Sequence, residues 1–412
     1  MGHRVRVRPA FLECTACGKR HEVRLRNLCD CGAPLFARYD FSAVHREDLL
    51  PRRDLWRYAP LLPVSEREVR SRGEGGTPLV RLARIGSGGR VARLKLGALY
   101  VKDEGVNPTA TFKARGMAVA VPMAKSLGAE SLVAPTAGNA GAALALYASA
   151  YGLEATVLTS DDAPAEAVRD ALALGAKVAR APGDIARAGR LAQEIAAATG
   201  AFNVATLREP YRVEGKKTML YEIWEDLGGM PDWILFPTGG GTGMAGIWKA
   251  LGELRDLGWY EGVWPRLGLV QAEGCAPLVR AWEGHRETAE PWPDPRTRAA
   301  GLRVPATLAD RIVLRALRET DGVGVTVTEE AMSLAATNLA ALEGVSACLE
   351  GAATLAGLRR LYDEGVITSS DRVVLVNTGA GRGAPDGVAP VVPTVRSAAE
   401  AIEQLGLTSR DP

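Results

Sequence analysis

Short apolar runs alternate with longer amphipathic segments through most of this chain. The runs that predict buried strands are residues 99–102, 132–135, 155–159, 177–180, 202–205, 233–237, 267–272, 323–328 and 372–377. The segments that predict helices are residues 114–125, 140–151, 163–174, 185–199, 213–227, 244–254, 329–343 and 350–364. Strands that alternate with helices form parallel sheets whose two faces are covered by helices. The pattern therefore predicts an α/β enzyme whose functional loops lie at the carboxyl ends of strands.

The length and the charge balance limit the class of protein. At 412 residues the chain is long enough for two or three domains with large cores. The hydrophobic share of 47% and the charged share of 24% are those of a soluble globular protein. The formal net charge of +2 argues against binding to nucleic acid or membranes, and no run is long enough to span a bilayer or to act as a signal peptide. These totals predict a cytoplasmic protein.

Residues 1–40 form a small unit that is marked by four clustered cysteines. Cys14 and Cys17 make a CxxC pair, Cys29 and Cys31 make a tighter CxC pair, and a glycine follows each pair. Four thiolates in this arrangement suit the tetrahedral site of a zinc ribbon. The alternative is a ribbon fold that keeps its thiols but holds no metal. No aromatic residues interleave the surrounding arginines, which favours solvated charge over RNA binding.

A lysine stands where a loop gives way to a helix, in the stretch 107–116 with the sequence NPTATFKARG. The turn pair Asn107-Pro108 ends the preceding strand, and Lys113 stands directly before the predicted helix 114–125. The start of a helix carries unpaired N–H groups and partial positive charge, which favours loss of a proton from an ammonium group. The 50 basic residues comprise 41 arginines and only nine lysines, so composition does not account for this one. Lys113 is therefore a candidate for chemistry that needs a neutral amine.

Three other loops at the predicted carboxyl ends of strands offer groups that could bind a ligand. They contain Thr136, Ala137, Gly138 and Asn139 in the first loop, Gly239, Gly240, Gly241, Thr242 and Gly243 in the second, and Thr378 in the third. Successive N–H groups before a helix bind phosphate, and the second loop lacks both the lysine of a P-loop and the spacing of a dinucleotide fingerprint. The four histidines lie outside these loops, which disfavours a histidine-based triad or catalytic metal site. A lysine, a phosphate loop, an amide and a hydroxyl together predict a site for pyridoxal 5'-phosphate (PLP).

Four motifs resemble those of the fold-type II PLP enzymes, the family of tryptophan synthase β, serine/threonine dehydratases and threonine synthase. They are the cysteine-containing leader that ends at Tyr39-Asp40, the EGGTPL stretch 74–79, the NPTATFKARGM stretch 107–117 and the PYRVEGKKT stretch 210–218. The resemblance covers roughly residues 11–390 and is greatest to threonine synthases. It implies two three-layer parallel-sheet domains, preceded by a small unit like a zinc ribbon.

The resemblance also implies a role for each candidate residue. Lys113 would hold PLP as a Schiff base and move protons, Asn139 would bond the ring hydroxyl of the cofactor, and Thr378 would face its pyridine nitrogen. The loop from Gly239 to Gly243 would bind the cofactor phosphate, and the backbone around Thr136 to Ala140 would receive the substrate carboxylate. Lys113 must be neutral to react, so we expect its apolar surroundings and the helix start to lower its pKa.

Two substrate classes remain open under this resemblance. A threonine synthase would convert O-phosphohomoserine and water to threonine and phosphate, with Arg115, Arg212 and Lys216 as candidates to bind the substrate phosphate. The alternative is a dehydratase or β-replacement enzyme that acts on an unphosphorylated serine-like or threonine-like amino acid. Alanines beside Asn139, where threonine synthases usually have a hydroxyl residue, and Glu209 in place of their usual asparagine favour this alternative. Threonine synthase is the leading hypothesis.

We expect the chain to have five parts, some of them discontinuous. They are the ribbon-like leader 1–40, a linker 41–72, a large PLP-binding domain formed by 73–110 and 200–390, a small mobile domain 111–199, and a C-terminal segment 391–412. The resemblance implies a homodimer. A non-catalytic protein that binds nucleic acid through the ribbon is a third hypothesis, and it would make Lys113 and the glycine-rich loop coincidental.

Overall fold

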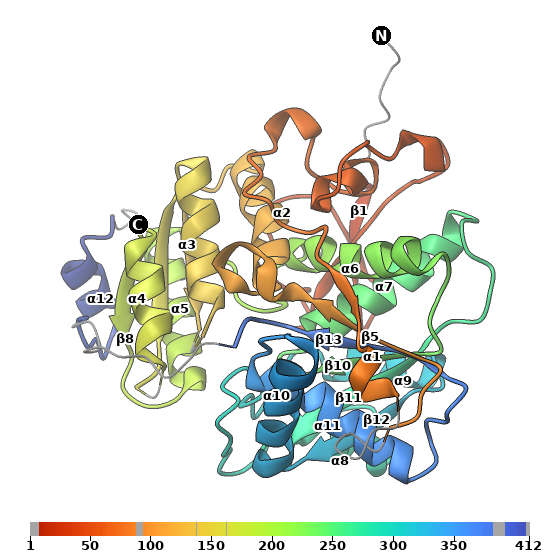
Figure 1. The fold of residues 1–412 in the computed structure, drawn as a ribbon. Helices are drawn as coiled ribbons and strands as arrows, with labels where there is room; N and C mark the ends of the chain where they lie inside the picture. The colour runs from red at the N-terminus through yellow and green to blue at the C-terminus, as the bar shows by residue number, and fades with distance from the viewer. Residues whose placement is uncertain (1–7, 88–93, 137, 162, 382–391, 409–412) are drawn as a thin grey trace. The chain divides into compact units, whose positions relative to one another are not determined.

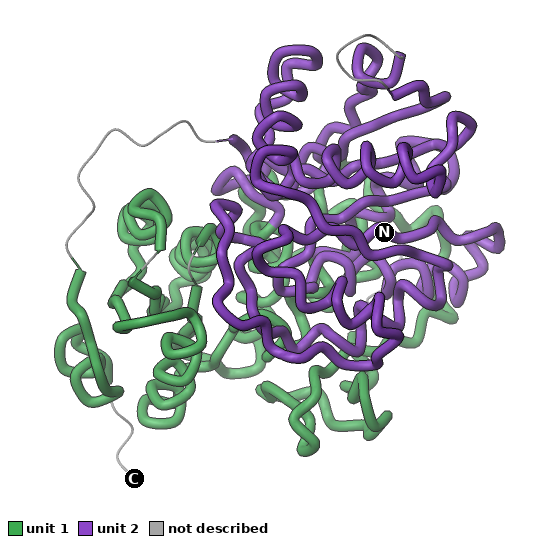
Figure 2. Tube along the Cα trace, turned by 90° about the horizontal axis from the view of Figure 1, so that it is seen from below, with its two compact units in different colours: residues 1–74, 113–215, 384–412 green, residues 75–112, 216–383 purple. Residues whose placement is uncertain are grey.

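The computed structural model describes residues 8–87, 94–136, 138–161, 163–381 and 392–408 (Figure 1). The chain divides into two compact units (Figure 2). Unit 1 consists of residues 1–74, 113–215 and 384–412, and unit 2 consists of residues 75–112 and 216–383. Within the described residues, no helix combines the length and the apolar character that a membrane crossing requires.

Unit 1 is built on a four-stranded parallel sheet with the strand order β8-β7-β6-β9. The strands are β6 (Ser131–Pro135), β7 (Glu154–Thr159), β8 (Lys177–Arg180) and β9 (Phe202–Asn203). The helices are α2 (Lys113–Ser126), α3 (Ala140–Tyr151), α4 (Ala165–Ala173), α5 (Ile185–Thr199), α12 (Ala398–Leu405) and the first turn of α6 (Tyr211–Leu227). Both α3 and α5 end at glycines, Gly152 and Gly200, whose positive φ angles suit a left-handed C-cap.

The side chains of this sheet alternate between two apolar clusters. Leu132 and Val157 lie in one cluster together with residues of α2 and α3. Their neighbours Val133 and Leu158 lie in the other cluster together with residues of α5 and α12. Successive side chains of a strand point to opposite faces of the sheet, so both faces are buried. This burial explains why the strands of unit 1 are continuous apolar runs rather than alternating ones.

A three-stranded antiparallel sheet of the order β2-β1-β3 also belongs to unit 1. Its strands are β1 (Phe11–Cys14), β2 (Arg20–His21) and β3 (Leu35–Arg38). The buried side chains of Leu12, Cys14, Cys29 and Leu35 belong to the same apolar cluster as those of α2. We call this sheet with its turns, residues 11–38, the ribbon. The ribbon therefore packs on the core of unit 1.

Residues 41–72 have the polar composition of a linker but are folded onto unit 1. They contain the short 3-10 helices η1 (Arg46–Asp48), η2 (Leu55–Leu61) and η3 (Glu66–Glu68). Leu55 and Trp56 are buried in the cluster that contains α2. The indole N–H of Trp56 donates to the carboxylate of Glu74, which also accepts a 2.8 Å hydrogen bond from the hydroxyl of Tyr147. A few well-placed apolar residues thus anchor a segment that is otherwise polar.

Unit 2 is built on a six-stranded sheet with the order β12-β11-β10-β13-β5-β4. The strands are β4 (Leu79–Arg81), β5 (Ala98–Asp103), β10 (Trp233–Pro237), β11 (Arg266–Ala272), β12 (Val323–Val327) and β13 (Arg372–Asn377). All neighbours pair in parallel except β4, which runs antiparallel to β5. The prediction of a wholly parallel sheet is therefore wrong at this edge. An edge strand of three residues can pair in either direction, and its length carries no signal of that direction.

The helices of unit 2 bury the sheet of that unit. They are α1 (Ala83–Gly86), α7 (Thr242–Asp256), α8 (Pro277–Glu283), α9 (Asp310–Glu319), α10 (Glu329–Glu343), α11 (Leu349–Asp363) and the rest of α6, with the 3-10 helices η4 (Glu104–Val106) and η5 (Pro108–Ala110). Leu235 and Leu375 face a cluster that contains residues of α10 and α11. Their neighbours Ile234 and Val374 are buried as well, so the sheet is covered on both faces.

Candidate active site

Lys113 is the first residue of α2, at the position predicted from the sequence, and its side chain is half-buried. The segment before it carries unusual backbone angles. Thr109 and Ala110 have φ values of 61° and 54°, in the left-handed region that non-glycine residues seldom adopt. Two such residues in succession are held only where the surrounding structure fixes them, and such strain is concentrated at functional sites. The approach to Lys113 is therefore a constrained segment.

Hydrogen bonds within unit 2 attach this approach to the end of strand β13. The backbone N–H of Phe112 donates to the carbonyl oxygen of Thr378 at 3.0 Å, and the hydroxyl of Thr111 donates to the same oxygen at 3.1 Å. The backbone N–H of Ala380 donates to the carbonyl oxygen of Ala110 at 3.0 Å. Lys113 is the next residue after Phe112 in the chain. These bonds therefore fix the residue before the lysine to Thr378, another residue of the predicted site.

The glycine-rich loop lies between β10 and the start of α7, also in unit 2. Strands β10 and β13 are parallel neighbours with the register Leu235↔Leu375, so the loops that follow them leave the same edge of the sheet. The rings of Phe112 and Phe236 meet edge to face, with centroids 5.8 Å apart. Unit 2 thus brings together the glycine-rich loop, Thr378 and the residue that precedes Lys113.

The loop offers backbone N–H groups at a helix start without a competing side chain. The N-cap of α7 is Gly241, with a φ of 76°, and it makes no side-chain hydrogen bond to the helix. The first N–H groups of a helix have no partner within it and bind anions, phosphate above all. A Cβ atom on Gly241 would lie 2.3 Å from the Cβ of Ala309, and one on Gly239 would lie 2.1 Å from the carbonyl oxygen of Gly301. The backbone of this loop is therefore shaped for a phosphate, and both glycines are required for that shape.

The segment that packs on the loop was not recognised from the sequence as part of the site. Gly301 and Ala309 touch the glycine positions, and the hydroxyl of Thr307 donates to the carbonyl oxygen of Gly240 at 3.0 Å. The backbone N–H of Gly301 in turn donates to the carboxylate of Glu350 at 2.7 Å. Residues 284–310 are rich in proline and arginine, which by itself indicates a surface loop. The small residues Gly301 and Ala309 are the signal of close packing that the sequence offers.

The first predicted loop lies in unit 1, between β6 and α3. Asn139 is the N-cap residue of α3, but its side chain makes no capping hydrogen bond and is half-buried. The hydroxyl of Thr136 accepts from the backbone N–H of Gly138 at 3.1 Å and donates to its carbonyl oxygen at 3.0 Å. Ala137, predicted to lie at the substrate carboxylate, is outside the described residues. An amide that does not cap its own helix is available to a ligand.

Arg212 lies in the first turn of α6, in unit 1, and is 2% exposed. Its Nη1 donates to the carbonyl oxygen of Val204 at 2.9 Å. Its Nε and Nη2 have no hydrogen-bond partner among the described residues. Burial lowers the pKa of the Arg212 guanidinium, and the nearby carboxylate of Glu209 acts in the opposite direction. A buried guanidinium with two nitrogens that lack hydrogen-bond partners is suited to bind an anion.

The other two candidates for the substrate phosphate are also buried. Arg115 is fully buried in α2, and Gly215 packs so closely on it that a Cβ there would lie 1.8 Å from the carbonyl oxygen of Arg115. Lys216 is 1% exposed, and its Nζ lies 4.5 Å from the centroid of the Phe112 ring within unit 2. Gly215 of α6 therefore packs on Arg115 of α2 in unit 1, and the next residue, Lys216, places its ammonium group against Phe112 in unit 2.

Two cysteines outside the ribbon are poor nucleophiles. Burial raises the pKa of the Cys348 thiol, and the carboxylate of Glu350 raises it further. Cys348 caps α11, where its sulfur accepts from the backbone N–H of Gly351 at 3.3 Å and lies 3.7 Å from the hydroxyl of Thr378. Burial also raises the pKa of Cys275. Both thiols therefore stay protonated at neutral pH, as expected for structural cysteines.

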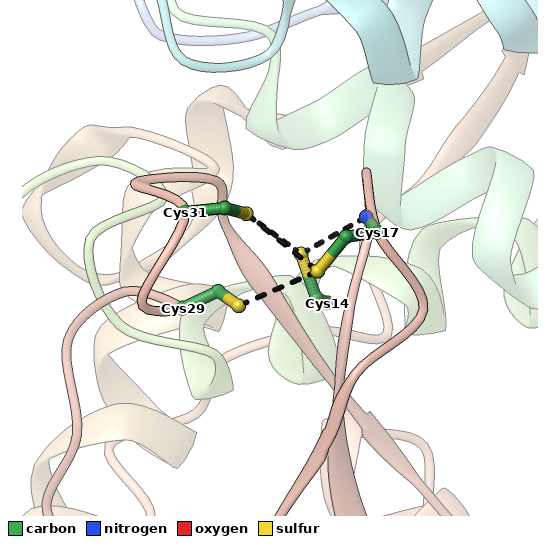
Figure 3. A group of neighbouring side chains, drawn as sticks. All are labelled: Cys14, Cys17, Cys29 and Cys31. Atoms are coloured by element: carbon green, nitrogen blue, oxygen red, sulfur yellow. Dashed lines mark hydrogen bonds between the residues drawn. The ribbon is translucent and has the colours of Figure 1, made fainter.

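The four ribbon cysteines meet in one cluster (Figure 3). Their sulfur atoms all lie within 4.8 Å of one another, and three of the sulfur–sulfur distances are 3.5 Å for Cys14–Cys31 and 3.7 Å for both Cys17–Cys29 and Cys17–Cys31. A tetrahedron with a Zn–S distance of about 2.3 Å has edges of about 3.8 Å. No disulfide joins them, since all are free cysteines. The cluster therefore has the size and the donor set of a tetrahedral thiolate metal site.

The ribbon supplies further groups that suit thiolate ligands. The backbone N–H groups of Ala16 and Cys17 donate to the sulfur of Cys14 at 3.4 and 3.3 Å, and Nε2 of His21 lies 3.3 Å from the sulfur of Cys29. Hydrogen bonds of this kind orient metal ligands and stabilise their negative charge. Gly18 and Gly32, which follow the two pairs, have φ values of 70° and 84° and allow the turns to close.

Comparison with known proteins decides the family. A family model described as "Pyridoxal-phosphate dependent enzyme" matches residues 70–379. The chain belongs to this family. Threonine synthase from Methanocaldococcus jannaschii is 32% identical over 382 residues, which cover 90% of this chain and 93% of that protein. Threonine synthase from Methanosarcina acetivorans is 35% identical over 376 residues, which cover 89% and 91%.

A solved structure confirms the fold of this PLP-dependent enzyme. Maize serine racemase superposes with a TM-score of 0.64 at 22% identity, covering 74% of this chain and 88% of that one. The α/β architecture with one mixed and one parallel sheet and the resemblance to fold-type II PLP enzymes are thereby confirmed. The residues present also fit the cofactor, because the loop at Gly239–Gly243 offers a phosphate site at a helix start and Lys113 offers an amine at another.

Proposed function

We propose that this PLP-dependent enzyme is a threonine synthase, a lyase that converts O-phosphohomoserine and water to threonine and phosphate. Two relatives named threonine synthase match about nine-tenths of both chains at 32% and 35% identity. The observation that carries the substrate class is the buried guanidinium of Arg212, whose Nε and Nη2 have no partner among the described residues. Buried donor atoms without a hydrogen-bond partner are costly, so this position is suited to the anionic group of a substrate.

The residues around the cofactor have separate tasks in this proposal. When bound, PLP withdraws electron density from the substrate carbons and so eases the removal of their protons. The amine of Lys113 holds the cofactor and moves protons at those carbons. The N–H groups from Gly239 to Gly243 would hold the cofactor phosphate, the amide of Asn139 would bond its ring hydroxyl, and the hydroxyl of Thr378 would be the partner of its pyridine nitrogen. The turn at Thr136 and Gly138 receives the substrate carboxylate.

The cationic side chains of Arg115, Arg212 and Lys216 are assigned to the substrate phosphate. All three are buried, and arginine and lysine are the side chains that bind phosphate. The carboxylate of Glu209 does not oppose this assignment, because it accepts hydrogen bonds from the backbone N–H groups of Tyr211 and Arg212 at 2.7 to 3.1 Å. Its charge is thereby directed to the start of α6, where a carboxylate is stabilised by the helix dipole.

The proposal is tested with two substrates. Purified PLP-loaded protein is mixed with O-phosphohomoserine in one assay and with serine or threonine in another, and phosphate, threonine and keto acid are measured. We expect stoichiometric phosphate and threonine from the first assay and little keto acid from the second. Keto acid from serine or threonine without phosphate release from O-phosphohomoserine would overturn the proposal in favour of a dehydratase.

The proposal includes a structural zinc ion bound by Cys14, Cys17, Cys29 and Cys31, for which the sulfur spacing is the support. We also propose that the enzyme is cytoplasmic, since all six cysteines among the described residues are free thiols, as in a reducing compartment.

A homodimer is proposed from the resemblance to the family. Light scattering of the purified protein measures its mass in solution and tests that assignment.

A further inference from the structure

Among the described residues, two side-chain hydrogen bonds join the ribbon and Tyr39, the residue that follows it, to the part of unit 1 that holds Arg212. The Nδ2 of Asn27 donates to the backbone carbonyl oxygen of Asn203, the last residue of β9, at 2.7 Å. The hydroxyl of Tyr39, directly after β3, donates to Oε2 of Glu214 in the first turn of α6 at 2.9 Å. We infer that the metal-bound ribbon positions the guanidinium of Arg212 for its anionic substrate group through these two hydrogen bonds.

Each of these hydrogen bonds ends beside a group that orients Arg212. Val204, the residue after Asn203, provides the carbonyl oxygen that accepts from Nη1 of Arg212 at 2.9 Å. Glu214 is two residues after Arg212 in the same helical turn. One bond therefore holds the backbone that binds the guanidinium, and the other holds the turn from which the side chain extends. Asn27 and Tyr39 act as positioning residues and need not touch the substrate.

The metal site determines where Asn27 and Tyr39 lie. Asn27 is two residues before Cys29, whose backbone N–H donates to the carbonyl oxygen of Ala33 at 3.0 Å. Tyr39 continues the strand β3, in which Leu35 pairs with Cys14 of β1. The three strands have only four, two and four residues, so the sheet depends on its packing against the core of unit 1 and on the metal site that holds its turns. In modules of this size, metal binding supplies much of the folding free energy.

Metal content and exchange kinetics test the inference without reference to any substrate. We expect about one zinc ion per chain by elemental analysis of the purified protein and a marked loss of zinc in the variant Cys31→Ser, which alters an exposed ligand. In that variant the backbone N–H groups of the peptide 209–216 should exchange with deuterium at least ~10-fold faster than in the wild type. Cys275→Ala, which removes a buried thiol outside the ribbon, is the matched control and should change neither readout.

Substitution of Tyr39 separates positioning from metal binding. Tyr39→Phe keeps the ring but removes the hydrogen bond to Glu214. We expect full zinc content, unchanged cofactor absorbance and unchanged kcat, with the KM for O-phosphohomoserine raised about 3- to 10-fold, the range for one lost hydrogen bond. Tyr260→Phe, whose hydroxyl bonds only the local carbonyl oxygen of Val263 in the described residues, is the control.

The effect on KM rests on the proposed function, and the outcomes distinguish the two. Protein without bound zinc, or a Cys31→Ser variant with unchanged exchange at residues 209–216, would overturn the inference while leaving the proposed reaction intact. Iron in place of zinc would overturn the assignment of the metal. A protein that binds zinc and shows the expected exchange, but does not turn over O-phosphohomoserine, would refute the proposed function and leave the coupling between ribbon and α6 standing.

Discussion

Both carboxylate oxygens of Glu209 accept hydrogen bonds from the backbone N–H of Arg212, at 3.0 and 3.1 Å. From the sequence alone, Glu209 favours a substrate without a phosphate. The structure instead assigns it to the start of α6, where the carboxylate satisfies backbone donors that the helix leaves unpaired. Its charge also faces the cationic side chain of the residue it caps, since the Glu209 carboxylate raises the pKa of the Arg212 guanidinium that burial lowers. Glu209 thus stabilises the first turn of α6, from which the side chain of Arg212 extends.

Replacement of Arg212 by lysine should weaken the enzyme chiefly through substrate binding. Lysine keeps the charge but cannot supply the fork of the guanidinium, and the loss of a charged hydrogen bond costs about 1.5–3 kcal/mol. We expect kcat/KM for O-phosphohomoserine to fall about 10- to 150-fold, mostly through KM, with the cofactor absorbance unchanged. Arg190→Lys, at an exposed position of α5 in the same unit, is the control. Equal kinetics in the two variants would remove Arg212 from the substrate site.

The sequence predicted the strands and helices well because most of them are long or fully buried. The apolar runs 177–180, 233–237 and 372–377 match strands β8, β10 and β13 residue for residue, and the periodic segments 185–199 and 329–343 match helices α5 and α10. These strands are buried on both faces, so their composition alone distinguishes them from the helices around them. The least accurate strand prediction was that for residues 202–205, because the observed strand β9 spans only Phe202–Asn203.

Three features of the site could not be predicted, because each depends on contacts between distant parts of the chain. The attachment of Phe112 to Thr378 joins residues that are far apart in sequence. The packing of Gly301 and Ala309 on the glycine-rich loop becomes visible only once the chain has folded around it. The hydrogen bonds that Glu209 accepts at the start of α6 are a structural role that its charge alone does not predict. Motifs indicate which groups carry the chemistry, but the residues that position them follow from tertiary structure.

Replacement of Lys113 by alanine should abolish turnover and covalent cofactor binding. The variant loses the amine at the start of α2 but keeps the glycine-rich loop, so we expect weak, reversible uptake of PLP. Borohydride treatment of the wild type should fix the cofactor to the peptide that contains Lys113, as mass spectrometry can detect, and should fix none in the variant. Lys125→Ala, at the exposed end of the same helix, should retain both activity and labelling. Labelling of another lysine in the wild type would contradict the assignment.

Replacement of Gly241 by alanine should weaken phosphate binding and destabilise unit 2. The new Cβ would lie 2.3 Å from the Cβ of Ala309, and the residue has a φ of 76°, so both packing and backbone are strained. We expect a loss of about 1–3 kcal/mol in the free energy of unfolding, together with a higher Kd for PLP in a titration. Gly252→Ala, in the same helix with no atom within 4 Å of its Cβ position, should be neutral or stabilise by up to about 1 kcal/mol. A Kd unchanged by Gly241→Ala would exclude this loop from the cofactor site.

The buried carboxylate of Glu253 should make the stability of unit 2 sensitive to acid. Burial alone would raise the pKa of Glu253, but the ammonium groups of Lys217 and Lys249 outweigh it and lower the pKa from 4.5 to about 2. The Lys217 contact measures 2.8 Å. Because the folded-state pKa is depressed, the stabilisation is complete above pH 4.5 and is lost as the pH falls toward 2.

Urea unfolding of wild type and Glu253→Gln at several pH values measures this contribution. At pH 7 the variant leaves two buried lysines without their carboxylate, which should cost about 3–5 kcal/mol in the free energy of unfolding. The difference in unfolding free energy between wild type and variant should narrow by up to about 1.4 kcal/mol for each pH unit below 4.5, because Glu253 of the wild type takes up a proton. Glu283→Gln, at the exposed end of α8, should follow the wild type at every pH. A difference between wild type and Glu253→Gln that stays constant from pH 7 to pH 3 would show that Glu253 is not the group that titrates.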